Sequence, residues 1–204
     1  IVISCSDDVG WNNKEQISYR NLAVDGELYG TGQNGFSEIF STYTGVNASN
    51  DISEKEILEN QHLMHGSGVA LGDVNGDELI DIYIPRIKED NVLYINKGEW
   101  QFEDFTLAAG VAAPNRYSNG SVFADVDGDR DLDLIVTALG GPNSVFINDG
   151  NGIFVEKKLD SKLNNPGSTS SALADVDNDG DLDLYITNYK RKAMRDSLPP
   201  PAIS

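Results

Sequence analysis

The sequence predicts an all-β fold, a partial β-propeller built from four-stranded blades. An acidic nine-residue segment occurs three times, and its starts are 52 and 50 residues apart. A fixed period of this length is typical of stacked units such as propeller blades. The strand expected after each acidic segment is apolar on both faces, so both faces need cover, which neighbouring blades provide. A β-solenoid is the alternative, but its repeats are usually shorter.

Each unit is expected to contain four short strands separated by Gly, Asn and Asp turn signals. In the first unit these strands fall at about 68–72, 80–86, 91–96 and 101–106. The third unit agrees only through its second strand, because Ala193 stands where the first two units have Asn91 and Asn143. We therefore expect blades over 67–111 and 119–160 and a partial blade over 169–189, together forming a repeat region at 67–189.

The segments around the repeats have their own expected roles. Residues 26–66 are expected to hold an outer strand and a connection, because 36–46 is similar to 102–111 and so predicts an isolated fourth strand. A short helical turn is expected near Ser53. Residues 190–204 are expected to be a loop or the truncated end of a longer chain. The alternative is self-association, because an open ring exposes unpaired strand edges.

Residues 1–25 are expected to form a leader or tether. Cys5 follows Val-Ile-Ser, which resembles the end of a bacterial lipoprotein signal and predicts a lipid anchor at this cysteine. The alternative is a chance free cysteine near a frayed terminus. Because Cys5 is the single cysteine of the chain, a disulfide framework and Cys-rich metal sites are excluded.

The charge balance favours cations as partners. The 204 residues carry 33 acidic and 15 basic side chains, for a net charge of −18. This balance argues against nucleic acid and anionic membrane surfaces as partners. No apolar run approaches the roughly 18 residues of a membrane-spanning helix, so no transmembrane segment is expected.

The three acidic segments, here called loops 1, 2 and 3, hold 14 of the 33 acidic residues. Each offers side-chain oxygens at positions one, three, five and nine and a main-chain carbonyl at position seven. Ca²⁺ takes six to eight such hard oxygens at about 2.3–2.6 Å. The sequence therefore predicts about three Ca²⁺ ions. The expected ligands in loop 1 are Asp73, Asn75, Asp77, Asp81 and the carbonyl of Leu79. Those in loop 2 are Asp125, Asp127, Asp129, Asp133 and the carbonyl of Asp131. Those in loop 3 are Asp175, Asp177, Asp179, Asp183 and the carbonyl of Asp181.

Three other interpretations of these loops exist. An EF-hand needs a Glu at position twelve and flanking helices, but Ile84, Val136 and Ile186 occupy that position inside expected strands. Mg²⁺ is disfavoured because it keeps its waters. Solvated Asp/Gly turns are the simplest alternative, which three copies in register argue against. Position six favours Gly, which only loop 3 supplies; Glu78 and Arg130 there predict weaker binding in loops 1 and 2.

The full repeat pattern resembles a known family. The loops, with Asn91-Val-Leu-Tyr-Ile-Asn-Lys-Gly98 and Phe102-Glu-Asp-Phe105 after them, are similar to the FG-GAP/VCBS-type repeats of integrin α propellers. They are more similar to the cartilage acidic protein group, whose members often carry an ASPIC/UnbV region. The resemblance covers about 36–190 and implies a seven-bladed propeller with calcium between the first and second strands of a blade, in secreted or surface proteins. No ASPIC/UnbV segment is present in this sequence.

Two classes of function remain. The favoured one is a non-catalytic, calcium-binding repeat scaffold outside the cell or in the cell envelope, which binds an extracellular protein or glycan in adhesion. The alternative is the propeller part of a larger secreted enzyme acting on polysaccharide or a similar substrate. No nucleophile–base pairing is evident, so no catalytic residue is assigned. Trp100 is expected to pack in the interior and not to serve as a sugar platform.

Overall fold

The computed structural model describes residues 2–5, 36–59, 63, 67–157, 159 and 167–189. The chain divides into two compact units, residues 1–47 and residues 48–204. In the first unit, strand β1 (Val2–Cys5) pairs antiparallel with β2 (Phe36–Ile39), and helix α1 (Ser41–Thr44) follows. The expectation that the strand at 36–46 is isolated is therefore wrong, because β1 is its neighbour. The remainder of the predicted tether at 6–25 and the segment 190–204 lie outside the described residues.

The first repeat forms a four-stranded antiparallel sheet. Helix α2 (Glu54–Glu59) comes before it, close to the predicted helical turn. The strands follow each other in chain order as β3 (Ala70–Gly72), β4 (Asp81–Ile84), β5 (Val92–Asn96) and β6 (Phe102–Asp104). Helix α3 (Thr106–Ala109) ends this unit, where the sequence predicted a strand continuing to 106.

The second repeat forms an equivalent sheet, and the third forms a two-stranded one. The second sheet contains β7 (Ser118–Ala124), β8 (Asp133–Ala138), β9 (Ser144–Asn148) and β10 (Phe154–Lys157). The third contains β11 (Ser168–Ala174) and β12 (Asp183–Asn188). Within the described residues the predicted architecture is confirmed: two complete four-stranded blades and part of a third, as in an open part of a propeller.

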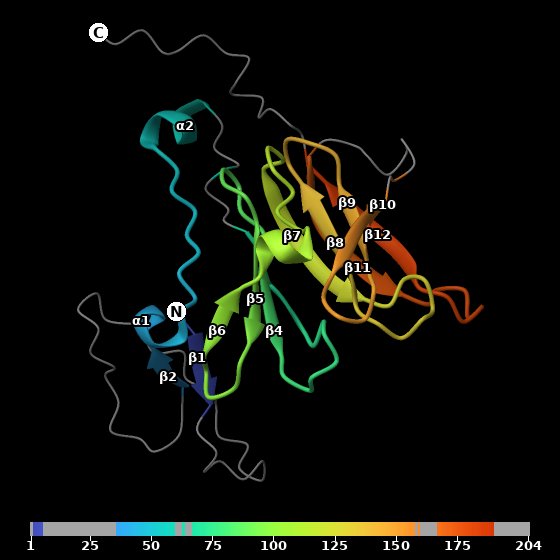
Figure 1. The fold of residues 1–204 in the computed structure, drawn as a ribbon. Coiled ribbons are helices and arrows are strands. Elements are labelled where there is room, and N and C mark those ends of the chain that lie inside the picture. Colours follow the sequence, from blue (N-terminus) through green and yellow to red (C-terminus); the bar gives the residue numbers. More distant parts are fainter. Residues whose placement is uncertain are drawn as a thin grey trace, which may run out of the picture. The chain divides into compact units, whose positions relative to one another are not determined.

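The first strand of each repeat is an edge strand of its sheet, and these three edge strands lie next to each other. Strand β7 contacts both β3 and β11, and Figure 1 shows the three sheets in succession from green through yellow to red. Because the middle sheet has a neighbour on each face, all six residues of β8 are buried. Strand β12 lacks this cover, and Tyr185 in its centre is 73% exposed.

The core fills the space between the first two sheets. Tyr83 and Leu93 of the first sheet belong to the same buried cluster as Leu134 and Phe146 of the second. The ring of Tyr83 meets Phe123 edge to face, with 6.4 Å between centroids. This packing fixes one blade against the next and so positions the loops at the ends of their strands. None of the helices in the described residues is long and apolar enough to cross a bilayer.

The similarity between residues 36–46 and 102–111 extends to their conformation. Each segment is a short strand followed by a four-residue helix, and each helix ends at a glycine in the left-handed region, Gly45 with φ 79° and Gly110 with φ 78°. A buried valine follows each glycine, Val46 and Val111. Glycine suits this helix-ending position because it carries no Cβ.

Candidate metal centre

Each acidic loop connects the first strand of a sheet to the second. Loop 1 lies between β3 and β4, loop 2 between β7 and β8, and loop 3 between β11 and β12. The aspartate at position nine is the first residue of the second strand in every case: Asp81, Asp133 and Asp183. The sheet therefore fixes position nine, and the rest of the loop must curl back towards it.

One hydrogen bond closes every loop. The backbone N–H at position two donates to Oδ2 of the position-nine aspartate, from Val74 to Asp81 at 2.9 Å, from Val126 to Asp133 at 2.9 Å, and from Val176 to Asp183 at 3.0 Å. A carboxylate has about four lone-pair sites, so a carboxylate that accepts this bond keeps capacity for a cation.

A second recurrent bond requires an unusual backbone conformation at position six. The N–H there donates to Oδ2 of the first aspartate, from Glu78 at 2.8 Å, from Arg130 at 3.0 Å and from Gly180 at 3.1 Å. All three residues have positive φ, at 68°, 82° and 96°. Position six therefore calls for the left-handed conformation in each loop, although only loop 3 has glycine there. Arg130 makes no ion pair with the described carboxylates.

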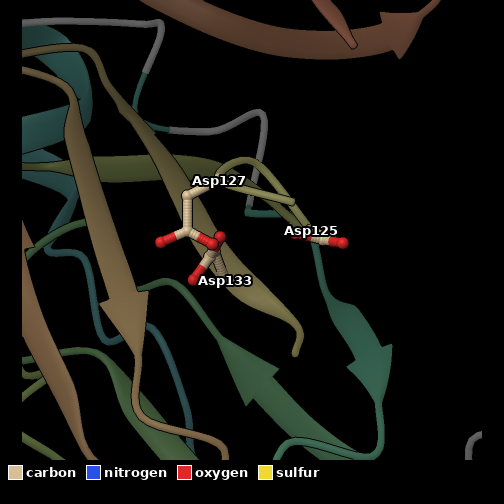
Figure 2. A group of neighbouring side chains, drawn as sticks. All are labelled: Asp125, Asp127 and Asp133. Carbon is tan, nitrogen blue, oxygen red and sulfur yellow. The ribbon is translucent and has the colours of Figure 1, made fainter. Parts of the chain in front are cut away.

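Loop 2 brings three carboxylates together. One oxygen from each of Asp125, Asp127 and Asp133 lies within 4.8 Å of the other two. Figure 2 shows Asp127 beside Asp133, with Asp125 at the start of the loop. Asp133 is buried, whereas Asp127 is exposed, so the cluster opens to solvent on one side. A cation can enter from that side without displacing the strands.

Loop 3 repeats this arrangement. Asp175, Asp177 and Asp183 each place a carboxylate oxygen within 4.8 Å of the others. All three are exposed. The corresponding positions, one, three and nine, form the cluster in loop 2, so the common backbone path of the two loops produces the same convergence.

Loop 1 differs because position three is an amide. Asn75 donates from Nδ2 to Asp77 at 3.0 Å, and Asp73 accepts four backbone N–H groups, from Asn75 to Glu78. Among the described residues, no group of three carboxylates forms in this loop. Oδ1 of Asn75 accepts the N–H of Asp77 at 3.2 Å, so rotation of the amide would break this bond and bring two acceptor oxygens together, which a cation between them would offset.

The remaining predicted ligands lie in the loops but outside these carboxylate groups. The position-five carboxylate accepts the position-seven N–H at 2.9 Å in every loop, Asp77 from Leu79, Asp129 from Asp131 and Asp179 from Asp181. This bond fixes the orientation of the position-seven residue, whose carbonyl is the predicted main-chain ligand. The loops contain oxygen donors only, without His or Cys, which suits a hard cation such as Ca²⁺.

The electrostatics of the loops also favour a cation. Loss of hydration, followed by the charges of Asp129 and Asp133, raises the pKa of Asp127. The same loss of hydration, with Asp129 and Asp125 adjoining, raises the pKa of Asp131. Burial raises the pKa of Asp81, although the N–H groups of Val74 and Asn96 oppose this effect. Neighbouring carboxylates within loop 1 and within loop 2 thus repel each other, and a bound divalent cation would relieve that repulsion.

Sequence reasoning missed the residues that hold the loops in place. Asn96 and Asn148 end the third strand of their sheets, and the backbone N–H of each donates to Oδ1 of Asp81 or Asp133, at 2.8 and 2.9 Å. The signal was available, because both asparagines stand 23 residues after the start of their loop. The valines at position two also recur, but their role depends on main-chain atoms and leaves no polar signature.

A family model of the FG-GAP-like repeat matches residues 73–136 and 125–186. Together the two matches span more than half of the chain, and each begins at the first aspartate of an acidic loop. The chain belongs to the FG-GAP-like repeat family. Each FG-GAP match runs from one acidic loop to the second strand of the next blade, so the matched unit includes an interface between blades.

Cartilage acidic protein 1 is similar to this FG-GAP chain over a short stretch. The human protein is 28% identical over 82 residues, which cover 40% of this chain and 12% of the human protein. The mouse and Xenopus tropicalis proteins give the same identity over the same length, covering 13% of each. The matched stretch is thus a small part of each of these relatives.

Proposed function

We propose that this chain is a non-catalytic, calcium-binding repeat scaffold that acts outside the cell or at the cell surface. The observation that carries the proposal is the convergence of three carboxylates in loop 2 and again in loop 3. Membership of the FG-GAP-like family and the similarity to cartilage acidic protein 1 support an extracellular setting. Attachment through a lipid at Cys5 remains a prediction, because the side chain of Cys5 lies outside those described.

Calcium would be structural in this scaffold. Loop 2 would hold it through Asp125, Asp127 and Asp133, and loop 3 through Asp175, Asp177 and Asp183, with the position-five carboxylates and position-seven carbonyls as further ligands. Bound calcium supplies positive charge that offsets the repulsion between these groups. Extracellular calcium modules commonly have dissociation constants of about 10⁻⁴–10⁻³ M, so each occupied loop would add about 1 kcal/mol at millimolar calcium.

The rigid blades would present their connecting turns to a protein or glycan partner. Trp100, in the turn between β5 and β6, is 44% exposed, so the expectation that it packs in the interior is wrong. An exposed indole offers a flat apolar face with one hydrogen-bond donor, which suits contact with a sugar ring or a protein surface. Adhesion through this turn is a proposal that a Trp100→Ala variant tests by loss of binding on glycan and matrix-protein arrays.

Bound metal and thermal unfolding test the calcium proposal. The protein is dialysed against calcium, its metal content is measured, and its melting temperature is compared before and after EDTA. Retained calcium and a lower melting temperature in EDTA are the expected results. The double variant Asp125→Asn/Asp127→Asn should lose one calcium ion. Asp90→Asn, which removes one carboxylate from an exposed position outside the loops, should retain the full content.

Two results would overturn the proposal. One is a protein free of calcium after dialysis, with the same melting temperature in calcium and in EDTA. The other is equal calcium content in the loop 2 variant and the Asp90→Asn control, because this would place the metal elsewhere in the molecule.

A further inference from the structure

A continuous chain of hydrogen bonds joins loop 1 to loop 2 through the interface between the first two blades. It starts at Asp133 of loop 2, whose Oδ1 accepts the backbone N–H of Asn148 at 2.9 Å. The side-chain Nδ2 of Asn148 then donates to the carbonyl of Val74 at 2.8 Å. The N–H of Val74 donates in turn to Oδ2 of Asp81 at 2.9 Å. This series of hydrogen bonds thus links the position-nine aspartates of the two loops.

All four residues joined by these hydrogen bonds are buried. Asp81 and Asp133 are fully buried, Val74 is 1% exposed and Asn148 is 4% exposed. Water therefore cannot easily replace a hydrogen bond that is broken by a movement of one residue. A buried donor or acceptor left unsatisfied loses its hydration without compensation, so the four residues are expected to move together.

The side chain of Asn148 has no free hydrogen-bonding capacity to absorb such a movement. Its second Nδ2 hydrogen bond goes to the carbonyl of Leu132 at 3.1 Å, and its Oδ1 accepts the N–H groups of Gly150 at 3.2 Å and Gly152 at 3.1 Å. A rotated amide would direct its oxygen at two carbonyls. The orientation of Asn148 is therefore fixed, and it is fixed by groups that belong to both blades.

Asn96 is the natural comparison. It stands at the same place in the first blade, its N–H donates to Asp81 at 2.8 Å, and its Nδ2 donates to the carbonyl of Ile80 at 3.0 Å. Both acceptors belong to its own loop. The side chain of Asn148, in contrast, donates a hydrogen bond to the acidic loop of another blade.

We propose that Asn148 couples cation binding in loop 1 to cation binding in loop 2. This inference rests on the proposed function and extends it, because it requires that loop 1 also binds calcium, through Asp73, Asp77, Asp81 and the side-chain oxygen of Asn75. A cation in loop 2 holds Asp133, which fixes Asn148, and Asn148 holds Val74 and through it Asp81 in the position that loop 1 needs. Occupation of either loop therefore prepares the other, and the two affinities change by the same factor.

Site-resolved titration measures this coupling. In a ¹⁵N-labelled protein, the amides of Gly76 and Gly128 report on loops 1 and 2, because they donate to the first aspartates of those loops at 2.8 and 2.7 Å. Calcium is added to the wild type and to the loop 2 variant Asp125→Asn/Asp127→Asn. The dissociation constant from Gly76 should rise about fivefold or more when loop 2 is inactive. Inactivation of loop 1 by Asp73→Asn/Asp77→Asn should weaken the Gly128 response by a similar factor.

One test variant and two controls define the route of the coupling. Asn148→Ser removes the side-chain link, so inactivation of loop 2 should then leave the Gly76 response unchanged. Asn96→Ser, its matched control, should preserve the coupling. Inactivation of loop 3 by Asp175→Asn/Asp177→Asn should leave Gly76 unaffected, because the chain of hydrogen bonds does not include that loop.

The outcomes separate this inference from the proposed function. If no loop amide responds to calcium, the proposed function fails and the coupling with it. If Gly128 responds and Gly76 does not, or if both respond but titrate independently in the folded loop variants, the coupling alone is overturned. Coupling of full size in a folded Asn148→Ser protein would also overturn the role given to Asn148.

Discussion

The side-chain amide of Asn91 donates a 2.7 Å hydrogen bond to the hydroxyl of Tyr83 inside the first sheet. That hydroxyl donates in turn to the carbonyl of Val111 at 3.0 Å, so the segment that follows helix α3 is held against the middle of β4. Burial raises the pKa of Tyr83 far above its ordinary value, which keeps the hydroxyl protonated as a donor. Tyr83 thus holds the segment after helix α3 against strand β4 of the first sheet.

Tyr83→Phe should lower the free energy of unfolding by about 1–3 kcal/mol, because it leaves the Val111 carbonyl and the Asn91 amide without a buried partner. Tyr185→Phe is the matched control, since Tyr185 occupies the same place in β12 but is 73% exposed. Urea unfolding of both variants checks this. Equal losses in the two variants would contradict the assigned role of the hydroxyl.

Gly120 determines how closely the inner strands approach. A Cβ at this position would lie 2.7 Å from Oγ1 of Thr137 and 3.1 Å from the backbone oxygen of Thr169 in the third sheet. Gly120→Ala should therefore destabilise the protein by about 1–3 kcal/mol through overpacking. The equivalent Gly68 has room, with its nearest neighbour at 3.5 Å, so Gly68→Ala should be neutral or slightly stabilising. Denaturant midpoints should separate the two variants, and similar midpoints would count against this packing argument.

The left-handed residues at position six predict a gain in stability on substitution. A non-glycine residue in this conformation costs about 1–2 kcal/mol, and the added freedom of glycine in the unfolded chain costs about 0.4–1 kcal/mol. Glu78→Gly and Arg130→Gly should each raise the stability of the metal-free protein by up to about 1 kcal/mol. Gly180→Ala should lower it. Unfolding in EDTA measures all three, and a loss of stability in both glycine variants would refute the strain argument.

The periodicity of the sequence was sufficient to predict the blades. The acidic loops mark the turn between the first two strands, and alternating apolar residues such as Ile82 and Leu134 place the second strand in the interior. Helix α3 was missed because four residues are too few to produce a helical period. The strand was predicted to continue to residue 106, whereas Thr106 begins the helix. The hydroxyl of Thr106 donates to Asp104, a local contact that the spacing of residues does not reveal.

The candidate site was only partly predictable. Alternating carboxylates identified the loops, but the grouping of positions one, three and nine depends on the backbone path between two strands. The difference between loop 1 and the others arises from one residue, Asn75, whose amide donates to Asp77 where loops 2 and 3 have a carboxylate at the same position. The contribution of Asn148 could not be foreseen, because its partner Val74 lies 74 positions away in sequence and uses its main chain.

The start of helix α2 gives a pH-dependent prediction. Ser53 donates its N–H and its hydroxyl to Oε2 of Glu56 at 2.9 and 2.6 Å, and Lys88 forms an ion pair with the same carboxylate at 2.9 Å. The hydrogen bond from Ser53, with that from Lys88, lowers the pKa of Glu56 from 4.5 to about 2. The folded state thus favours the ionised carboxylate more than the unfolded chain does, so this group stabilises the fold above about pH 4.5.

That contribution should disappear as the pH falls from about 4.5 towards about 2. The melting temperature of the wild type should exceed that of Glu56→Gln by a constant amount at neutral pH, and the difference should shrink steadily in acid. Glu54→Gln, on the same helix, is the control, because Glu54 makes no side-chain hydrogen bond or ion pair with the described residues. A difference between wild type and Glu56→Gln that stays constant down to pH 2.5 would show that the carboxylate is not held in its ionised form by Ser53 and Lys88.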